Sequence, residues 1–187
     1  MTRIIGLSGH KRSGKDTAAG HLVAEHGFTR LSFAQSIYDM LYAMDPVAYA
    51  HNGIVAAKVW RVQDVVDDLG WETAKDQFPE IRNLLQRLGT EAGRGVLGEN
   101  VWVDAAMRRA GSIDGPVVFS DVRFPNEADA IRSAGGEVWR IIRPGHDSAN
   151  DPHPSEHALD DYEFDKRLHN NDTISSLYYI TDLALKG

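Results

Sequence analysis

The 187-residue sequence contains no cysteine and no apolar run long enough to cross a membrane. The lack of cysteine excludes disulfides, thiolate catalysis and metal clusters held by thiolates, and it is compatible with a reducing cytosol. The first apolar run, residues 4–7, is far shorter than a signal peptide or a membrane-spanning helix requires. We therefore expect a cytoplasmic chain with no membrane partner.

Basic residues are also in short supply, since 20 Lys and Arg stand against 27 Asp and Glu, giving a formal net charge of −7 at pH 7. A nucleic-acid polymer usually requires a basic field, so the charge disfavours that class of partner. Hydrophobic residues make up 42% of the chain, which is enough to bury a core. We expect a single domain over residues 1–187, as a monomer or a homodimer.

Short apolar runs alternate with amphipathic helical patterns along the chain. The apolar runs, typical of buried strands, are residues 3–8, 116–121 and 138–142, and we expect two further short strands at 28–33 and 166–169. Helical spacing follows at 16–26, 37–44, 62–69, 81–88, about ten residues from 101, 125–134 and 174–185. We interpret residues 46–58 as irregular and the glycines at 89, 93, 95 and 98 as a break in the helical pattern. The alternation predicts a three-layer α/β/α fold with a five-stranded parallel sheet and ligands at the strands' carboxyl ends.

The segment Gly9 to Lys15 matches the phosphate-loop pattern G-x-x-x-x-G-K, between a strand and a helix as the pattern requires. Glycines let successive N–H groups point at one anion, and the helix N-terminus adds partial positive charge. Lys15 would reach the β- and γ-phosphates as a point charge. A glycine-rich turn that binds nothing is the alternative. The expected nucleotide contacts are Gly9, Lys11, Arg12, Ser13, Gly14, Lys15, Asp16 and Thr17.

The residue after Lys15 departs from the phosphate-loop pattern, because it is Asp16 rather than serine or threonine. The hydroxyl comes one residue later, at Thr17. A carboxylate is a hard oxygen ligand, so Asp16 could take over the coordination of Mg²⁺. Asp16 and Thr17 are therefore both predicted metal ligands.

A further acid, Asp121, ends the strand at 116–121, where phosphate-loop proteins carry a carboxylate that holds Mg²⁺ directly or through water. Arg123 follows two residues later, and its guanidinium could pair with a phosphate and offset charge on the transferred group. A surface salt bridge between Asp121 and Arg123 is the alternative. We predict that both are catalytic and that Asp121 is a metal ligand. No guanine-reading Asn-Lys-x-Asp string is present, which leaves a small kinase as the favoured class.

Four strings stand in a fixed order: GHKRSGKDT at 9–17, LSFA at 31–34, LQRLGTE at 85–91 with Gly93-Arg94 and Trp102-Val103, and SDVRFPNE at 120–127. Together they resemble the deoxynucleoside monophosphate kinases of tailed bacteriophages, over most of the chain. The resemblance implies a P-loop kinase fold, ATP as donor, Mg²⁺, and γ-phosphoryl transfer to a deoxynucleoside 5′-monophosphate.

The same resemblance implies roles for further segments. Arg94 and Arg123 would hold phosphates, so Arg94 joins the predicted catalytic residues. The segment after Phe33, about 34–100, would be an acceptor-binding insertion, and about 144–165 would be a lid. A phage-encoded chain would act in the host cytoplasm.

The predicted lid at 144–165 contains no Arg or Lys, whereas adenylate-kinase-like relatives carry several arginines there. Arg143, just before it, is therefore our candidate for the ATP side. Residues 153–157, HPSEH, match a zinc-peptidase pattern, but Pro154 fits only a first helical turn, so we interpret them as a helix start. Candidate base neighbours, with core packing as the default for the aromatic ones, are Phe33, Tyr38, Trp60, Trp71, Trp102, Gln86 and Glu91.

Two other functions fit the same motifs. A kinase of another small metabolite, of the dephospho-coenzyme A or sugar-acid type, would use the same phosphate loop and Asp121 with a different acceptor. A non-catalytic nucleotide-sensing protein would bind ATP and change its affinity for a partner without turnover.

Overall fold

The computed structural model describes residues 3–48, 59–145 and 157–187. The chain forms two compact units, one from Met1–Phe33 with Val103–Gly187 and one from Ala34–Trp102. The predicted acceptor-binding insertion, about 34–100, covers nearly the same residues as the second unit.

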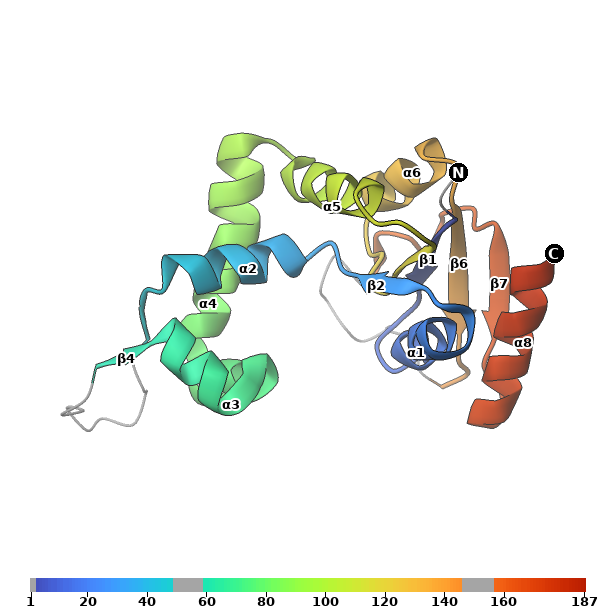
Figure 1. The fold of residues 1–187 in the computed structure, drawn as a ribbon, viewed down its shortest axis with the longest axis horizontal. Helices are drawn as coiled ribbons and strands as arrows, with labels where there is room; N and C mark the ends of the chain where they lie inside the picture. Colours follow the sequence, from blue (N-terminus) through green and yellow to red (C-terminus); the bar gives the residue numbers. More distant parts are fainter. Residues whose placement is uncertain (1–2, 49–58, 146–156) are drawn as a thin grey trace. The chain divides into compact units, whose positions relative to one another are not determined.

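The first unit is built on a five-stranded parallel sheet, which confirms the predicted fold class (Figure 1). Its strands, in spatial order, are β2 (Thr29–Leu31), β5 (Val117–Phe119), β1 (Ile4–Ser8), β6 (Glu137–Ile142) and β7 (Lys166–His169). Strand β1 is central, because Ile5 pairs with Val118 on one side and with Glu137 on the other. All pairings in this sheet are parallel, so the carboxyl ends of the strands lie at one edge.

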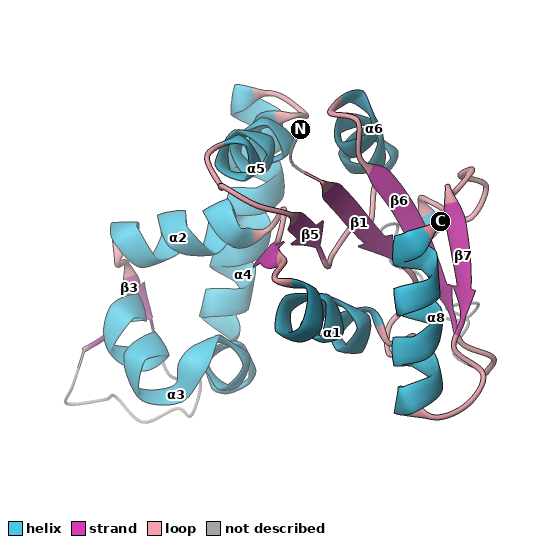
Figure 2. Ribbon diagram, turned by 45° about the vertical axis from the view of Figure 1, so that its right-hand side comes forward, coloured by secondary structure: helices cyan, strands magenta, loops and turns pink. Residues whose placement is uncertain are grey.

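Helices cover both faces of this sheet (Figure 2). One face packs on α1 (Lys15–His26) and α8 (Ile174–Lys186), the other on α5 (Val101–Gly111) and α6 (Pro125–Ser133). Alternate strand residues supply the two cores, as the twofold strand period requires: Ile4 faces α5 and α6, whereas Ile5 faces α1 and α8. Burial on both faces explains why β1 and β5 are continuous apolar runs, whereas the edge strands β2 and β7 are partly exposed and carry basic residues.

The second unit is mainly helical. It contains α2 (Gln35–Met44), α3 (Val62–Gln77), α4 (Pro79–Arg87), the π-helix η1 (Leu88–Leu97), and the short antiparallel pair β3 (Val47–Ala48) and β4 (Trp60–Arg61). Its core gathers one side of each of the first three helices, with Leu41, Val65 and Ile81 buried. Helix α3 is kinked at Gly70, whose φ of 72° is left-handed.

The prediction that four glycines break the helical pattern is wrong for Gly89, Gly93 and Gly95, because residues 88–97 are helical, and right for Gly98, which ends η1 with a φ of 112°. Two of these glycines serve packing instead. A Cβ on Gly93 would lie 2.3 Å from the Trp102 indole, and the Gly89 carbonyl accepts a hydrogen bond of 2.9 Å from Trp102 Nε1. The glycines therefore make room for a buried tryptophan.

Smaller differences from the predictions concern the bounds of elements and the exposure of some apolar side chains. The region predicted to be irregular contains β3, while its residues 49–58 lie outside the described ones. The helix predicted over 62–69 continues to Gln77. Val23, Leu69 and Ile174, apolar residues within the helical patterns, are 39%, 38% and 61% exposed. In the described part of the chain, every helix is too short or too polar to span a membrane.

Replacing Gly93 by alanine should destabilise the protein by about 1–3 kcal/mol, the usual cost of overpacking, because the new methyl group meets the Trp102 ring. Gly95→Ala is the matched control: its nearest contact, the Thr90 carbonyl oxygen, is 3.6 Å away, an ordinary van der Waals distance. Urea unfolding followed by tryptophan fluorescence compares the two. Equal stability of the two variants would contradict this account of the glycine.

Candidate active site

The loop between β1 and α1 turns back on itself through two glycines. Gly9 has φ 148° and Gly14, at the N-terminal end of α1, has φ 108°. A Cβ on Gly9 would lie 2.5 Å from the Ile141 carbonyl oxygen, and one on Gly14 would lie 2.7 Å from Asn170 Nδ2. Both conformation and space therefore require glycine at these two positions.

Arg12 also adopts a left-handed conformation, with φ 64°, although it is not glycine. An L-residue in that region costs on the order of 1 kcal/mol, and such strain often marks functional loops. The adjacent Ser13 donates its backbone N–H to the His10 carbonyl over 3.1 Å, closing the turn.

The Ser13 side chain is turned into the loop. Its Oγ is buried, and none of the described residues forms a hydrogen bond with it. The Ser13 carbonyl accepts 2.8 Å from Nδ2 of buried Asn170, which directly follows β7. Our sequence reasoning missed Asn170, although a polar residue just after a strand is the signal that identified Asp121.

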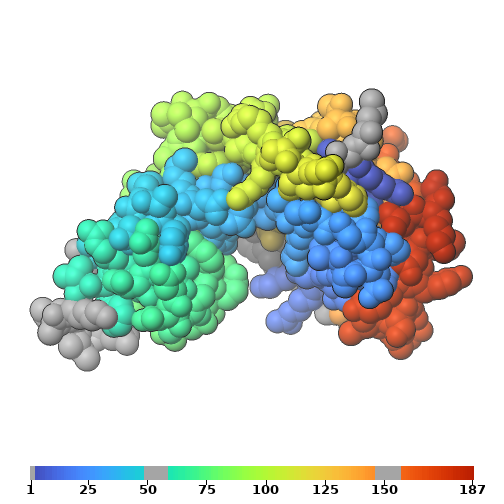
Figure 3. Space-filling view, viewed as in Figure 1, coloured from blue at the N-terminus to red at the C-terminus, as the bar shows by residue number. Residues whose placement is uncertain are grey.

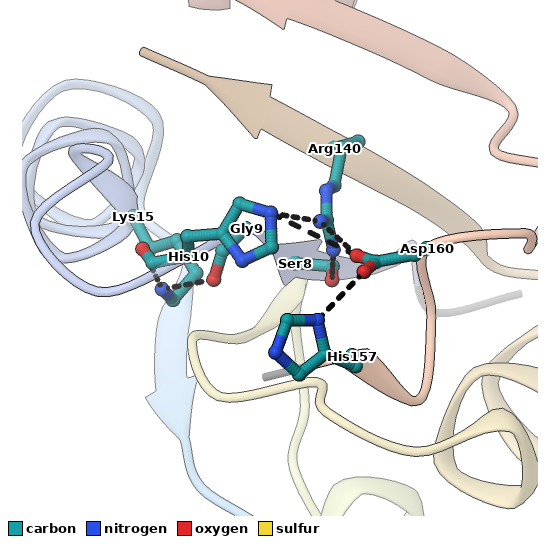
Figure 4. A network of polar contacts seen from close by, with 7 residues as sticks. All are labelled: Ser8, Gly9, His10, Lys15, Arg140, His157 and Asp160. Carbon is teal, nitrogen blue, oxygen red and sulfur yellow. Dashed lines mark hydrogen bonds and ion pairs between the residues drawn. The ribbon is translucent and has the colours of Figure 1, made fainter. Parts of the chain in front are cut away.

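Lys15 lies where the phosphate-loop pattern predicts it. Its Nζ donates to the carbonyl oxygens of Gly9 (2.5 Å) and His10 (2.9 Å) across the loop (Figure 4). These carbonyls hold the ammonium group inside the turn. Its positive charge therefore lies beside the position at which this motif binds an anion.

Asp16, a predicted metal ligand, forms an ion pair with an arginine. Its carboxylate is exposed and forms an ion pair with Arg30 of β2, while Arg30 Nε donates 2.9 Å to Ser120 Oγ. Thr17 is half-buried in the first turn of α1. The loop and the end of β5 are thus joined by Arg30.

Asp121 follows β5, the neighbour of β1, and its carboxylate is fixed by the segment after β2. Oδ2 accepts from Ser32 Oγ over 2.5 Å and Oδ1 accepts from the Phe33 N–H over 3.0 Å. The backbone after Asp121 stays beside β1, because Val122 N–H donates to the Leu7 carbonyl over 3.2 Å. Asp121 and the phosphate loop therefore lie at the same edge of the sheet.

Arg123 is held through its backbone. Its N–H donates 2.7 Å to Glu127 Oε2, which also accepts from the Phe124 N–H over 3.1 Å. The Glu127 carboxylate is buried and satisfies the amide groups ahead of α6. This contact fixes where the chain carrying Arg123 enters the helix.

Sequence reasoning also missed Arg140, which lies within β6 in register with Ser8 of β1 (Figure 4). Its side chain is only 11% exposed. Nη1 donates 3.2 Å to Ser8 Oγ, and Nη2 lies 2.9 Å from His10 Nε2 and 3.1 Å from Asp160 Oδ1. His157 Nδ1 lies 3.0 Å from the other oxygen of Asp160. Because a guanidinium only donates, His10 Nε2 acts here as an acceptor.

Arg143 reaches the phosphate loop from β6, as its Nη1 lies 3.4 Å from the Arg12 carbonyl oxygen. A cavity of about 210 Å³ opens between the loop and the strand ends. Its charged or polar lining residues are His10, Ser13, Arg140, Arg143, Asp160 and Arg167. Three guanidinium groups at one small cavity favour an anionic ligand.

The described part of the predicted lid is packed rather than loose. Leu159 is 2% exposed and belongs to the core between the sheet and helices α5 and α6. Asp165 Oδ2 accepts from the Val138 N–H over 2.7 Å and from Arg132 Nε over 3.1 Å. The rest of the predicted lid, residues 146–156, lies outside the described residues, and so does most of the zinc-peptidase pattern at 153–157.

Four further residues that the sequence predicts to contact ligands have the following surroundings. Arg94 belongs to η1 of the second unit, where it is half-buried. Phe33 and Trp102, two candidates for stacking on a base, are 3% and 4% exposed, and Phe33 stacks on Phe119 at 4.5 Å. Both therefore follow the default for aromatic residues, which is core packing. Lys11 is exposed on the phosphate loop.

The sequence model of a family described as deoxynucleotide monophosphate kinase matches residues 48–180, more than two thirds of the chain. The chain belongs to this family of phosphotransferases. A putative deoxynucleotide monophosphate kinase of Acanthamoeba polyphaga mimivirus is 34% identical, with 94% of this chain and 92% of the relative covered.

A deoxynucleoside-5′-monophosphate kinase of Escherichia phage T5 is 25% identical, with 71% and 72% of the two chains covered. Among solved structures, a shikimate kinase from Aquifex aeolicus aligns with 98% of this chain and 96% of its own, at 11% identity and a TM-score of 0.49.

Replacing Gly14 by alanine should destabilise the protein by about 1–3 kcal/mol and weaken nucleotide binding, because the methyl group meets Asn170 at a left-handed φ. Gly20→Ala in the same helix is the control. A Cβ there has no neighbour within 4 Å, so the variant should gain up to about 1 kcal/mol from helix propensity. Urea unfolding and nucleotide titration measure both effects, and a Gly14→Ala protein as stable as the parent would refute the argument.

Asp165 should make stability depend on acid pH. Burial raises the pKa of its carboxyl, but the Val138 N–H and Arg132 outweigh burial and lower the pKa below its ordinary value of 3.8. The stabilisation is therefore complete above that ordinary value and disappears as the pH falls through the lower folded value. Asp165→Asn should unfold at lower urea than the parent at neutral pH, with the gap closing in strong acid. A gap independent of pH would exclude this role.

Proposed function

We propose that this protein transfers the γ-phosphoryl group of ATP to deoxynucleoside 5′-monophosphates, producing diphosphates in one direct, in-line step. The observation that carries the proposal is the phosphate loop, in which two left-handed glycines shape the turn and Lys15 places its ammonium group across it. Held at this position by two backbone carbonyls, the lysine offers its positive charge to a bound phosphate.

The donor side is supported by the cationic cavity beside the loop. Arg140 and Arg143 line it together with Ser13, whose buried Oγ has no partner among the described residues. A triphosphate can accept hydrogen bonds from these groups, from the backbone N–H groups of Lys11 and Arg12 in the loop, and from those of Asp16 and Thr17 in the first turn of α1.

The residues present also fit Mg²⁺. Asp121 is held rigidly by Ser32 and Phe33, and Asp16 and Thr17 offer hard oxygen donors nearby in sequence to Lys15. When bound, Mg²⁺ neutralises charge on the phosphates. To coordinate Mg²⁺, Asp16 would have to release Arg30. An Asp16→Ser variant therefore tells whether Asp16 or Thr17 is the metal ligand.

Transfer between two phosphate groups mainly needs alignment and positive charge. The acceptor phosphate is already ionised, so no strong general base is required. We assign this work to Lys15, Arg94 and Arg123, with Arg143 on the ATP side. Both relatives are named as kinases of deoxynucleoside or deoxynucleotide monophosphates, which supports the same acceptor class for this chain.

The first test is an assay of ADP release with purified protein, ATP and Mg²⁺ against deoxynucleoside monophosphates, ribonucleoside monophosphates, dephospho-coenzyme A and sugar acids. Deoxynucleoside monophosphates should give the highest kcat/KM. Higher turnover with a metabolite outside the nucleotides would replace the proposed acceptor. ATP binding without turnover of any acceptor would favour a nucleotide sensor.

Replacing Lys15 by alanine should lower kcat/KM by at least about 100-fold, because charge stabilisation of the transferred group is lost. Lys186→Ala is the matched control, since it removes one exposed lysine at the end of α8. Steady-state kinetics with ATP and the best acceptor compare them. Full activity of Lys15→Ala would overturn the proposed role of the loop.

A further inference from the structure

Two histidines of α1 and an aspartate of α8 converge on one point, away from the phosphate loop. Nε2 of His21 and Nε2 of His26 each lie 2.7 Å from Oδ1 of Asp182. The three potential ligand atoms all lie within 4.8 Å of one another. We propose that this triad binds one divalent transition-metal ion of the Zn²⁺, Co²⁺ and Ni²⁺ class and so joins α8 to α1.

Packing fixes the two imidazole rings. His21 is 9% exposed and stacks on Tyr178 of α8, with ring centroids 4.2 Å apart and planes 8° from parallel. His26 meets the His21 ring edge-on at 5.6 Å and 81°. Because both rings already direct Nε2 at Asp182, binding an ion costs little side-chain entropy.

The distances suit a small ion. Tetrahedral ligands at ~2.1 Å from zinc are ~3.4 Å apart, so each imidazole nitrogen has to recede from Oδ1 by roughly 0.7 Å. The ligand set decides the kind of metal: two imidazole nitrogens and one carboxylate oxygen favour transition metals, whereas Mg²⁺ and Ca²⁺ favour all-oxygen sites. This site is therefore chemically distinct from the magnesium ligands proposed beside Lys15.

The Asp182 carboxylate supplies a negative charge that can bind the ion. Among the described residues, the partners of the Asp182 carboxylate are the two imidazoles, with no lysine or arginine in an ion pair. His26 also lies in the last turn of α1, where the helix dipole favours a cation.

Access to the site comes from one side. His26 lines a cavity of about 630 Å³ whose other charged lining residues are Arg3 and Asp114. The side chains of His26 and Asp182 are 27% and 37% exposed, so water can complete the coordination.

The ion would act on stability rather than on phosphoryl transfer. Helix α8 lies along α1 (red beside blue in Figure 3), and both helices cover the same core. An ion that binds the folded chain and not the unfolded one raises stability by mass action. The inference is independent of the proposed function, because its readouts are binding and unfolding.

The test is calorimetric titration of the tag-free, chelator-stripped protein with Zn²⁺ in excess Mg²⁺, which saturates oxygen-rich sites. One Zn²⁺ should bind per chain and raise Tm. His26→Gln and Asp182→Asn should each weaken binding at least 10-fold. His169→Gln, which removes an exposed histidine of β7, should bind like the parent.

A second measurement on the parent protein keeps the test independent of variant folding. Titration with Co²⁺ should broaden the imidazole NMR signals of His21 and His26 first and leave those of His157 and His169 sharp. Absence of stoichiometric binding, equal loss in His169→Gln, or broadening confined to other histidines would each overturn the proposed site, leaving a hydrogen-bonded triad only.

Discussion

A loop that binds an anion must direct its carbonyl oxygens elsewhere, and the segment after β1 depends on this constraint. Three of its carbonyls have definite partners: Lys15 Nζ binds those of Gly9 and His10, and Asn170 Nδ2 binds that of Ser13. The two left-handed glycines make the turn possible, and the strained φ of Arg12 completes it. Stability of the turn therefore comes from Lys15 of α1 and Asn170 after β7, which leaves the rest of the loop for the phosphate binding that we propose.

The parallel sheet explains why residues far apart in sequence meet at this loop. Ser8, Asp121 and Asn170 stand at or just after the carboxyl ends of β1, β5 and β7, and Arg140 of β6 is in register with Ser8. A parallel sheet gathers such ends at one edge, so each strand adds one chemical group. The hydrogen bonds from Arg140 to Ser8 and from Asn170 to Ser13 are direct consequences.

The sequence predicted the parts of the fold that depend on local patterns. Short apolar runs identified β1, β5 and β6, and the glycine-lysine motif located the loop, because both signals lie within a few neighbouring residues. The glycines of η1 were misinterpreted because glycine serves both helix breaking and close packing, and the deciding partner of Gly93 is Trp102, nine positions away.

Residues outside the motifs also differ in whether a local sequence pattern reveals them. Arg140 did leave a signal, since a charged residue inside the apolar run 138–142 must find partners once the strand is buried. His21 left none that is readable alone, because its partner Asp182 comes 161 residues later. Spatial pairing of this kind follows from the fold and not from spacing.

Helix α1 connects the two chemistries through its own dipole. Its N-terminus faces the phosphate loop, where partial positive charge favours an anion, and its last turn carries His26, where partial negative charge favours a cation. The amide groups at one end and the His–Asp–His triad at the other thus match the two signs of the same field. Because α8 packs on α1 and is preceded by Asn170, which holds the Ser13 carbonyl, the same C-terminal segment contacts both ends of α1.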